Sequence, residues 1–248
     1  MQQVASVSEA QPPLSEAARV VDTFVAPSKT FTDIRRKATW WLPFILMCIV
    51  SFFFTSAVGK QIGFETIAHQ QIDKNHFAAD QINSLPRDQQ VAAYQSAGKR
   101  TKVVSYFYPV LIFVFAAIIS LLWWASLNFG LGAQSKYWQI FAVGMYAGLP
   151  KLFIFILAAI LLYAGVGLDN FDMQNPIGTN LGYFISPDSP ALRAAGSFLD
   201  VFGIWSLILA IYGTAIVTKK KPSQTAVVIV GWWIVGLIVV TALAAFTA

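Results

Sequence analysis

The chain has little charge and few of the residues that soluble enzymes use. Only 12% of its 248 residues are charged, and it holds one cysteine and two histidines. One cysteine cannot form an internal disulfide. The sequence also lacks a phosphate-binding glycine loop, an H-E-x-x-H pair and a G-x-S-x-G elbow. We therefore predict a protein that is not an enzyme, with no catalytic residues, no metal site and no cofactor.

Hydrophobic residues dominate instead. They make up 56% of the chain, and the mean hydropathy is +0.61. A water-soluble domain of this size could not bury so much apolar surface. The hydrophobic residues gather in five runs, each about the 20 residues that a helix needs to cross a bilayer. The sequence thus predicts an all-α polytopic membrane protein, a bundle of five transmembrane helices. The predicted spans are residues 40–58, 103–127, 138–166, 198–217 and 225–246, within a membrane domain over residues 40–248.

The segment before the first span divides into two parts. Residues 1–14 have few bulky apolar side chains and are predicted to be a disordered lead. Residues 15–39 show apolar residues at helical spacing, with a second short helix expected after Pro27, which predicts a cytoplasmic arm of short amphipathic helices on the membrane surface. The residues predicted to contact the membrane surface or a partner are Phe31, Arg35, Arg36 and Lys37.

Two connections are too long to be simple turns. Residues 59–102 form a long polar loop, for which the pattern predicts two short amphipathic helices broken near Pro86. Residues 168–197 contain several prolines and glycines and are predicted to be an irregular loop.

The distribution of Lys and Arg predicts the orientation. The amino-terminal segment and the even-numbered connections hold more of them than the opposite side, where most lie in the long loop of residues 59–102 and count for less. The amino terminus is therefore predicted to be cytoplasmic, and the carboxyl terminus, after five crossings, to be outside.

One ionisable residue stands inside a predicted span. Lys151 follows Pro150 near the middle of the third span, where a charge is costly unless it is paired or faces a cavity. Asp200, at the start of the fourth span, is a candidate partner. Either the two form an intramembrane charge pair or line a cavity, or Lys151 extends to the interface and Asp200 caps its own helix.

Several segments resemble the Yip domain family of five-span membrane proteins, in its prokaryotic-type branch. The likeness is carried by Val25–Ile34 running into Trp40–Pro43, by Phe198–Leu207 and by Ser223–Ala226. The resemblance implies a five-helix bundle with a cytoplasmic amino terminus. Eukaryotic members interact with Rab-type GTPases and carry an Asp-Leu-Tyr-Gly-Pro-like motif. This chain lacks that motif, so GTPase binding is doubtful.

Two functions follow as hypotheses. The first, which the lack of a polar span favours, is a scaffold or adaptor for membrane proteins or lipids, with membrane lipids and another membrane protein or a second copy as partners. The alternative is a small transporter or channel with a cavity near Pro150, Lys151 and Asp200. In either case we expect residence in the cell (inner) membrane and no binding of nucleic acid.

Overall fold

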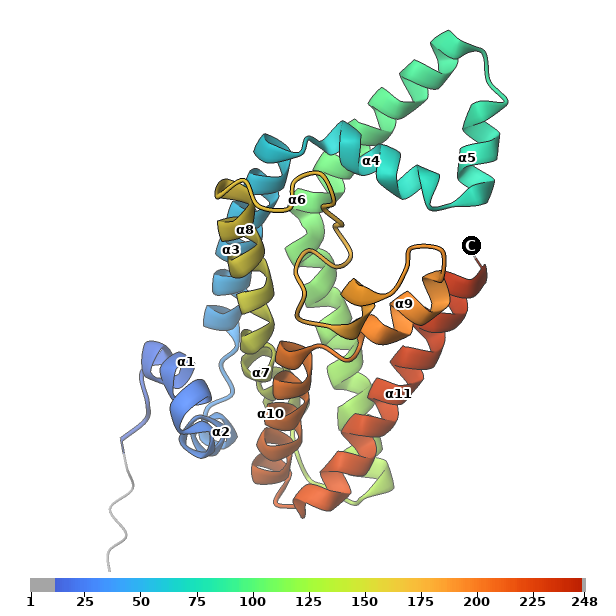
Figure 1. Cartoon of the computed structure of the whole chain (residues 1–248). Coiled ribbons are helices and arrows are strands. Elements are labelled where there is room, and N and C mark those ends of the chain that lie inside the picture. Colours follow the sequence, from blue (N-terminus) through green and yellow to red (C-terminus); the bar gives the residue numbers. More distant parts are fainter. Residues whose placement is uncertain (1–11, 247–248) are drawn as a thin grey trace, which may run out of the picture.

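The bundle consists of helices that run the length of the molecule, with shorter helices at both ends (Figure 1). The computed structural model of the chain describes residues 12–246. Within that range the regular structure is helical, apart from one isolated bridge between Asn180 and Asp200. Five helical segments are long and apolar enough to cross a membrane. The predicted all-α polytopic fold is confirmed. Most of the lead predicted over residues 1–14, residues 1–11, lies outside the described range.

The five spans fall close to their predicted positions, with one clear difference. They are α3 (Trp41–Gln61), α6 (Arg87–Ala125) continued by the π-helical turn η1 (Ser126–Gly130), α7 (Tyr137–Ala147) joined through the 3₁₀ turn η2 (Leu149–Lys151) to α8 (Leu152–Tyr163), α10 (Val201–Thr218) and α11 (Pro222–Phe246). The second span begins well before residue 103, because no proline separates polar residues 87–102 from the apolar run that follows.

The first long connection is therefore mostly helical. It forms α4 (Phe64–Asp73) and α5 (His76–Asn83), which lie with the first turns of α6 as a lobe beyond one end of the bundle (Figure 1). Gly98 lets α4 approach α6 closely, since a Cβ atom there would stand 3.0 Å from Glu65 Cα. The helix α5 has no buried residue, so α4 and α6 hold the lobe together.

The second long connection is better packed than an irregular loop requires. It contains the 3₁₀ turn η3 (Leu181–Phe184) and the helix α9 (Pro190–Ser197), which packs on α11. Phe171 and Ile177 are buried in a hydrophobic cluster with residues of α3 and α8. Gly182 and Gly196 pack backbone against backbone, and a Cβ atom on Gly196 would lie 2.7 Å from Gly182 N. This connection is a structured cap on the end of the bundle that carries the lobe.

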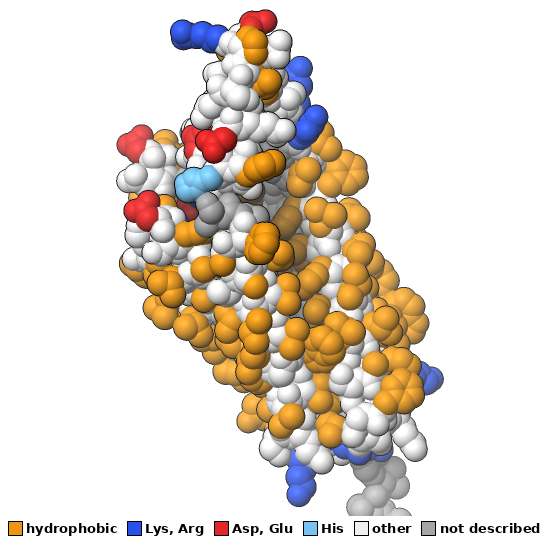
Figure 2. Space-filling model, turned by 90° about the vertical axis from the view of Figure 1, so that its right-hand side faces the viewer, with side chains coloured by type: hydrophobic (Ala, Val, Ile, Leu, Met, Phe, Trp, Pro, Cys, Tyr) orange, Lys and Arg blue, Asp and Glu red, His pale blue; other side chains and the backbone are white. Residues whose placement is uncertain are grey.

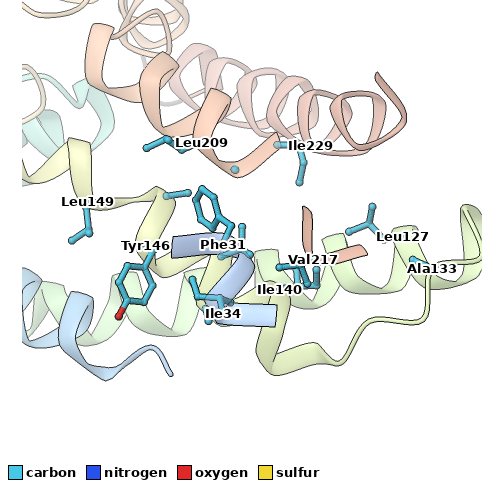
Figure 3. Packing of buried hydrophobic residues seen from close by; sticks show 14 residues of the cluster. Phe31, Ile34, Leu127, Ala133, Ile140, Tyr146, Leu149, Leu209, Val217 and Ile229 are labelled. Atoms are coloured by element: carbon cyan, nitrogen blue, oxygen red, sulfur yellow. The ribbon is translucent and has the colours of Figure 1, made fainter. Parts of the chain in front are cut away.

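The amino-terminal arm packs against the bundle at the opposite half from the lobe. It consists of α1 (Glu16–Val25) and α2 (Pro27–Arg36), beside α7 and α10 (Figure 1). Phe31 and Ile34 of α2 are 0% exposed and lie among core residues of α7, α10 and α11 (Figure 3). The prediction that Phe31 contacts the membrane surface or a partner is wrong. The apolar side of α2 meets protein, because Gly213 of α10 leaves room for the Phe31 ring: a Cβ atom there would lie 2.7 Å from it.

Candidate functional site

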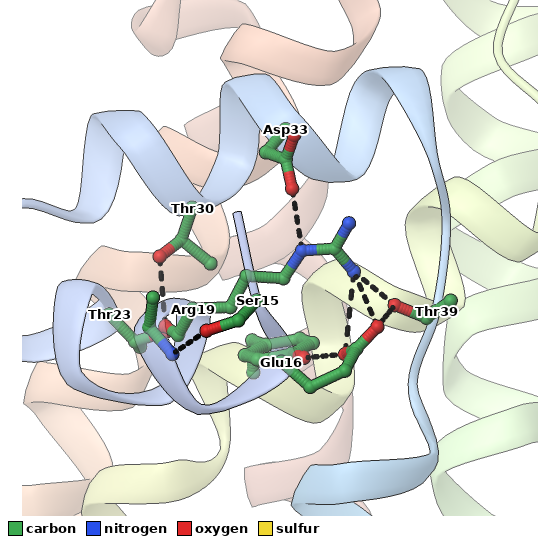
Figure 4. Close-up of polar contacts among 9 residues, drawn as sticks. Ser15, Glu16, Arg19, Thr23, Thr30, Asp33 and Thr39 are labelled. Carbon is green, nitrogen blue, oxygen red and sulfur yellow. Dashed lines mark hydrogen bonds and ion pairs between the residues drawn. The ribbon is translucent and has the colours of Figure 1, made fainter. Parts of the chain in front are cut away.

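A buried arginine joins the two helices of the arm. The Arg19 side chain is 1% exposed, and its Nε donates a hydrogen bond to Oδ2 of Asp33 on α2 at 2.7 Å (Figure 4). Its Nη1 lies 3.3 Å from Oε1 of Glu16, one turn earlier on α1. Burial alone would lower the pKa of Arg19, but the hydrogen bond to Asp33 and the charges of Glu16 and Asp33 raise it overall. The three side chains form an ion-pair network that fixes α1 on α2.

The same network reaches the first and third spans. Arg19 Nη1 also donates to the hydroxyl of Thr39, just before α3, and that hydroxyl donates to Glu16 Oε1 at 2.6 Å. From α7, the Tyr146 hydroxyl donates to Glu16 Oε2 at 2.8 Å. Glu16 therefore links the arm to α7 and to the residues just before α3. We call Glu16, Arg19, Asp33, Thr39 and Tyr146 the arm clasp.

Backbone groups of the arm are also paired. Ser15 caps α1 through a hydrogen bond from Ala18 N to its side chain at 3.1 Å (Figure 4). The carbonyl of Arg19 accepts hydrogen bonds from the hydroxyls of Thr23 and Thr30, at 2.7 and 2.9 Å. Thr30 belongs to α2, so this carbonyl also binds one arm helix to the other.

The outer side of α1 is apolar. Val21 is 59% exposed and Val25 is 74% exposed, whereas Arg19 faces inward. On the inner side, the Phe24 ring packs edge-on to Phe153 of α8 and Trp205 of α10, with centroids 5.6 Å apart in both pairs. A helix with its arginine inside and valines outside is arranged for an apolar surrounding, so α1 is suited to contact lipid beside the bundle.

Basic residues from three segments lie at the arm's end of the bundle. Gln139 Nε2 of α7 donates to the carbonyl of Arg35 at 2.8 Å and so fixes the end of α2 beside the start of α7. The α10–α11 turn contains Lys219, whose φ of +57° is unusual for a residue other than glycine. We call this set the basic face: Arg35, Arg36, Lys37, Lys136, Lys219, Lys220 and Lys221.

Lys151 and Asp200 do not form an ion pair in the described residues. Asp200 is buried, caps α10 by accepting from Gly203 N at 2.7 Å, and accepts from the Thr179 hydroxyl at 2.6 Å. Pro150 is buried in η2, while Lys151 is exposed. By helical rise, Lys151 stands about 21 Å from the start of α7 and about 18 Å from the end of α8. The lysine is thus exposed near the middle of the third span, and Asp200 takes the capping role.

At the other end of the molecule, an ion-pair cluster joins the lobe to the cap. Asp172 lies 2.8 Å from Nζ of Lys74 and 2.5 Å from Nη2 of Arg193. Burial raises the pKa of Asp172, but hydrogen bonds from Lys74 and from the Gln174 backbone, with the charges of Lys74 and Arg193, lower it overall. Asp172 therefore stabilises the lobe in its ionised form.

The arm clasp was missed from the sequence because its members are ordinary surface residues by type. One signal was present in the sequence. Arg19 is a charged residue between Ala18 and Val20, on the inner side of α1, a helix with a stripe of apolar residues. Nothing in the local sequence indicates Tyr146 as a partner, since it is 130 residues away from Glu16.

Together, the five spans and the docked arm define a polytopic α-helical membrane protein. Hydrophobic side chains cover much of the length of the molecule on the face in Figure 2, and acidic side chains gather toward the lobe end. The family model of the Yip1 domain matches residues 21–243. Because this match covers most of the chain, the protein belongs to the Yip1 domain family, as the resemblance indicated. Neither the curated proteins nor the solved structures gave a match.

Proposed function

We propose that this protein is a non-enzymatic scaffold or adaptor, which captures membrane proteins or lipids through its basic face. The observation that carries the proposal is the docking of the arm. The clasp and the buried Phe31 fix α2, and Gln139 fixes its last turn, so that Arg35, Arg36 and Lys37 are held at one end of the bundle. A preorganised cationic surface binds acidic partners with less loss of conformational freedom than a flexible tail.

The charge balance at this end supports the proposal. The carboxylates of Glu16 and Asp33 both contact Arg19, which is not a residue of the basic face. Arg36 and Lys37 are exposed, as are Lys136 and Lys221. Acidic lipid headgroups and acidic protein segments are the chemical groups that such a surface attracts.

The test is charge reversal with a matched control. The variant Arg35→Glu/Arg36→Glu/Lys37→Glu changes three basic side chains on the arm. The control, Lys99→Glu/Arg100→Glu/Lys102→Glu, makes the same change in charge on α6 at the lobe end. Each protein is purified in mild detergent, its bound proteins and lipids are identified by mass spectrometry, and its binding to phosphatidylglycerol and phosphatidylcholine vesicles is compared.

We expect the arm variant to lose its capture of an acidic lipid or protein companion and the control to keep it. Since the arm is held through the Arg35 carbonyl and not its side chain, hydrogen exchange of α1 and α2 should be unchanged. Equal capture by both variants would refute the basic face as the contact.

The orientation remains part of the proposal. With a cytoplasmic amino terminus, the basic face would meet cytoplasmic partners, and the membrane would be the cell (inner) membrane of a prokaryote. A single cysteine at exposed Ser28, in a Cys48→Ala background, reports the side of the arm. Labelling by an impermeant maleimide in intact cells would contradict the cytoplasmic placement.

A small transporter or channel is the second candidate, and one observation favours it. Lys151 is exposed at the helix break of the third span, where an ionisable side chain usually has a function. On this hypothesis, Lys151→Met removes ligand-dependent thermal stabilisation or flux in liposomes and leaves the fold intact. Unchanged transport would exclude Lys151 from the pathway.

A further inference from the structure

A hydrophobic groove runs between α3 and α8 on the lateral surface of the bundle. Its volume is about 410 Å³, and its lining includes Val50 and Phe53 of α3 and Phe155, Ala159 and Tyr163 of α8. These residues repeat at intervals of three and four along their helices, so each helix turns one continuous face to the groove. The helices α3 and α8 lie side by side over this length (Figure 1).

A cation and an aromatic ring close one end of the groove. Lys60, in the last turn of α3, lies with Nζ 6.0 Å from the centre of the Tyr163 ring, the last residue of α8. Lys60 is seven residues beyond Phe53, which places it on the groove side of α3. The described part of the chain places no carboxylate in an ion pair with Lys60. The Lys60 ammonium group can therefore bind an anion from outside the protein.

The dimensions match one leaflet of a bilayer. From Val50 to Lys60 the helical rise is about 15 Å, and the hydrocarbon core of a bilayer is about 30 Å thick, so that each leaflet contributes about half. Lys60 and Tyr163 are both at the ends of their spans, at the level where lysine and tyrosine side chains meet lipid headgroups. The distance from the apolar part of the groove to Lys60 thus matches the distance from a lipid acyl chain to its headgroup phosphate.

We infer that this groove binds one anionic phospholipid, in the leaflet opposite the arm. An acyl chain lies along Phe53, Phe155 and Ala159, and the phosphate group binds Lys60 beside the Tyr163 ring. This site is separate from the basic face, which lies at the other end of the bundle and is proposed to capture partners. Failure of either proposal leaves the other unaffected.

The test compares two groove variants with one control. Lys60→Gln removes the charge and keeps a polar side chain, and Ala159→Phe fills the groove and keeps the charge. Lys102→Gln is the control, because Lys102 is an exposed lysine of α6 in the same half of the molecule and does not line the groove. The proteins are placed in nanodiscs of phosphatidylcholine with increasing phosphatidylglycerol, and the retained phospholipid is measured by native mass spectrometry after detergent extraction.

We expect the unaltered protein to retain about one phosphatidylglycerol molecule. One interfacial lysine contributes about a fivefold preference for anionic lipid, so Lys60→Gln should lose about that factor. Ala159→Phe should retain neither lipid, and Lys102→Gln should behave as the unaltered protein.

Three results would overturn the inference. Lys60→Gln could retain phosphatidylglycerol with undiminished preference. Lys102→Gln could lose as much as Lys60→Gln, which would indicate unspecific attraction to the headgroup layer. Inorganic phosphate alone could raise the melting temperature as much as the lipid does, which would assign the site to free phosphate. Lys60 is exposed, so its substitution tests the site even if Ala159→Phe does not fold.

Discussion

Breaking the arm clasp should release the arm and leave the five spans folded. Arg19→Met removes the only side chain that contacts both Glu16 and Asp33 among the described interactions. Asp33 is then a buried carboxylate without its cation. Removing one partner of a buried ion pair costs about 3 to 5 kcal/mol, and because Glu16 is 21% exposed we expect the lower end, about 3 kcal/mol. This corresponds to about a hundredfold increase in the open population of the arm.

Hydrogen–deuterium exchange of the protein in nanodiscs measures this change directly. Amides of α1 and α2 should exchange about a hundredfold faster in Arg19→Met, while amides of α7 and α10 should keep their rates. Lys29→Met is the control, since Lys29 is an exposed cation of the same arm.

A second variant separates the ion pair from the packing. In Arg19→Met/Asp33→Leu both charges are removed, and replacement of a buried ion pair by hydrophobic residues is often neutral or stabilising. The double variant should therefore regain much of the protection that Arg19→Met loses. If Arg19→Met exchanges like the unaltered protein, the clasp does not hold the arm, and Phe31 and its neighbours do so alone.

Three further predictions follow from individual contacts. Gly213→Ala should weaken docking of the arm by about 1 to 3 kcal/mol, because the new methyl group overlaps the Phe31 ring. The control Gly231→Ala has open space around the new methyl group and should leave docking unchanged. Hydrogen exchange of α2 measures the difference. Tyr146→Phe removes one hydrogen bond to the arm and should lower protection of α1 by about 1 kcal/mol. Since the pKa of Asp172 is lowered by folding, its contribution is complete above about pH 4 and disappears as the pH falls through the lower folded value, so melting curves of Asp172→Asn and the unaltered protein should converge in acid.

The spans were predictable because their signal is local. A run of about 20 apolar residues has one stable outcome in a membrane, whatever the rest of the chain does. The predicted start of the second span was too late for the same reason. Hydropathy locates only the apolar run that begins at Val103, whereas the helix begins at Arg87, because the polar residues before the run are also compatible with a helix in water.

The arm illustrates what local patterns leave out. Its helices and their starts at Ser15 and Pro27 follow from capping and proline preferences. Its apolar residues, however, fit two surroundings equally well, since lipid and protein both accept a phenylalanine. Phe31 packs inside the protein because Gly213, almost two hundred residues later, has no side chain and leaves room for the Phe31 ring.

This dependence on distant residues also sets the order in which the arm can dock. Its contacts come from Tyr146 in the third span and from Gly213 in the fourth, whereas its own residues precede all five spans. The arm is synthesised before the spans that hold it, so it stays undocked while the spans assemble. During that time Arg19 is either hydrated or paired with Asp33 alone. The arm residues of the basic face therefore take their fixed positions only when the third and fourth spans are packed together. A charged surface of this kind depends on the finished fold, so its arm residues reach their final positions only after assembly.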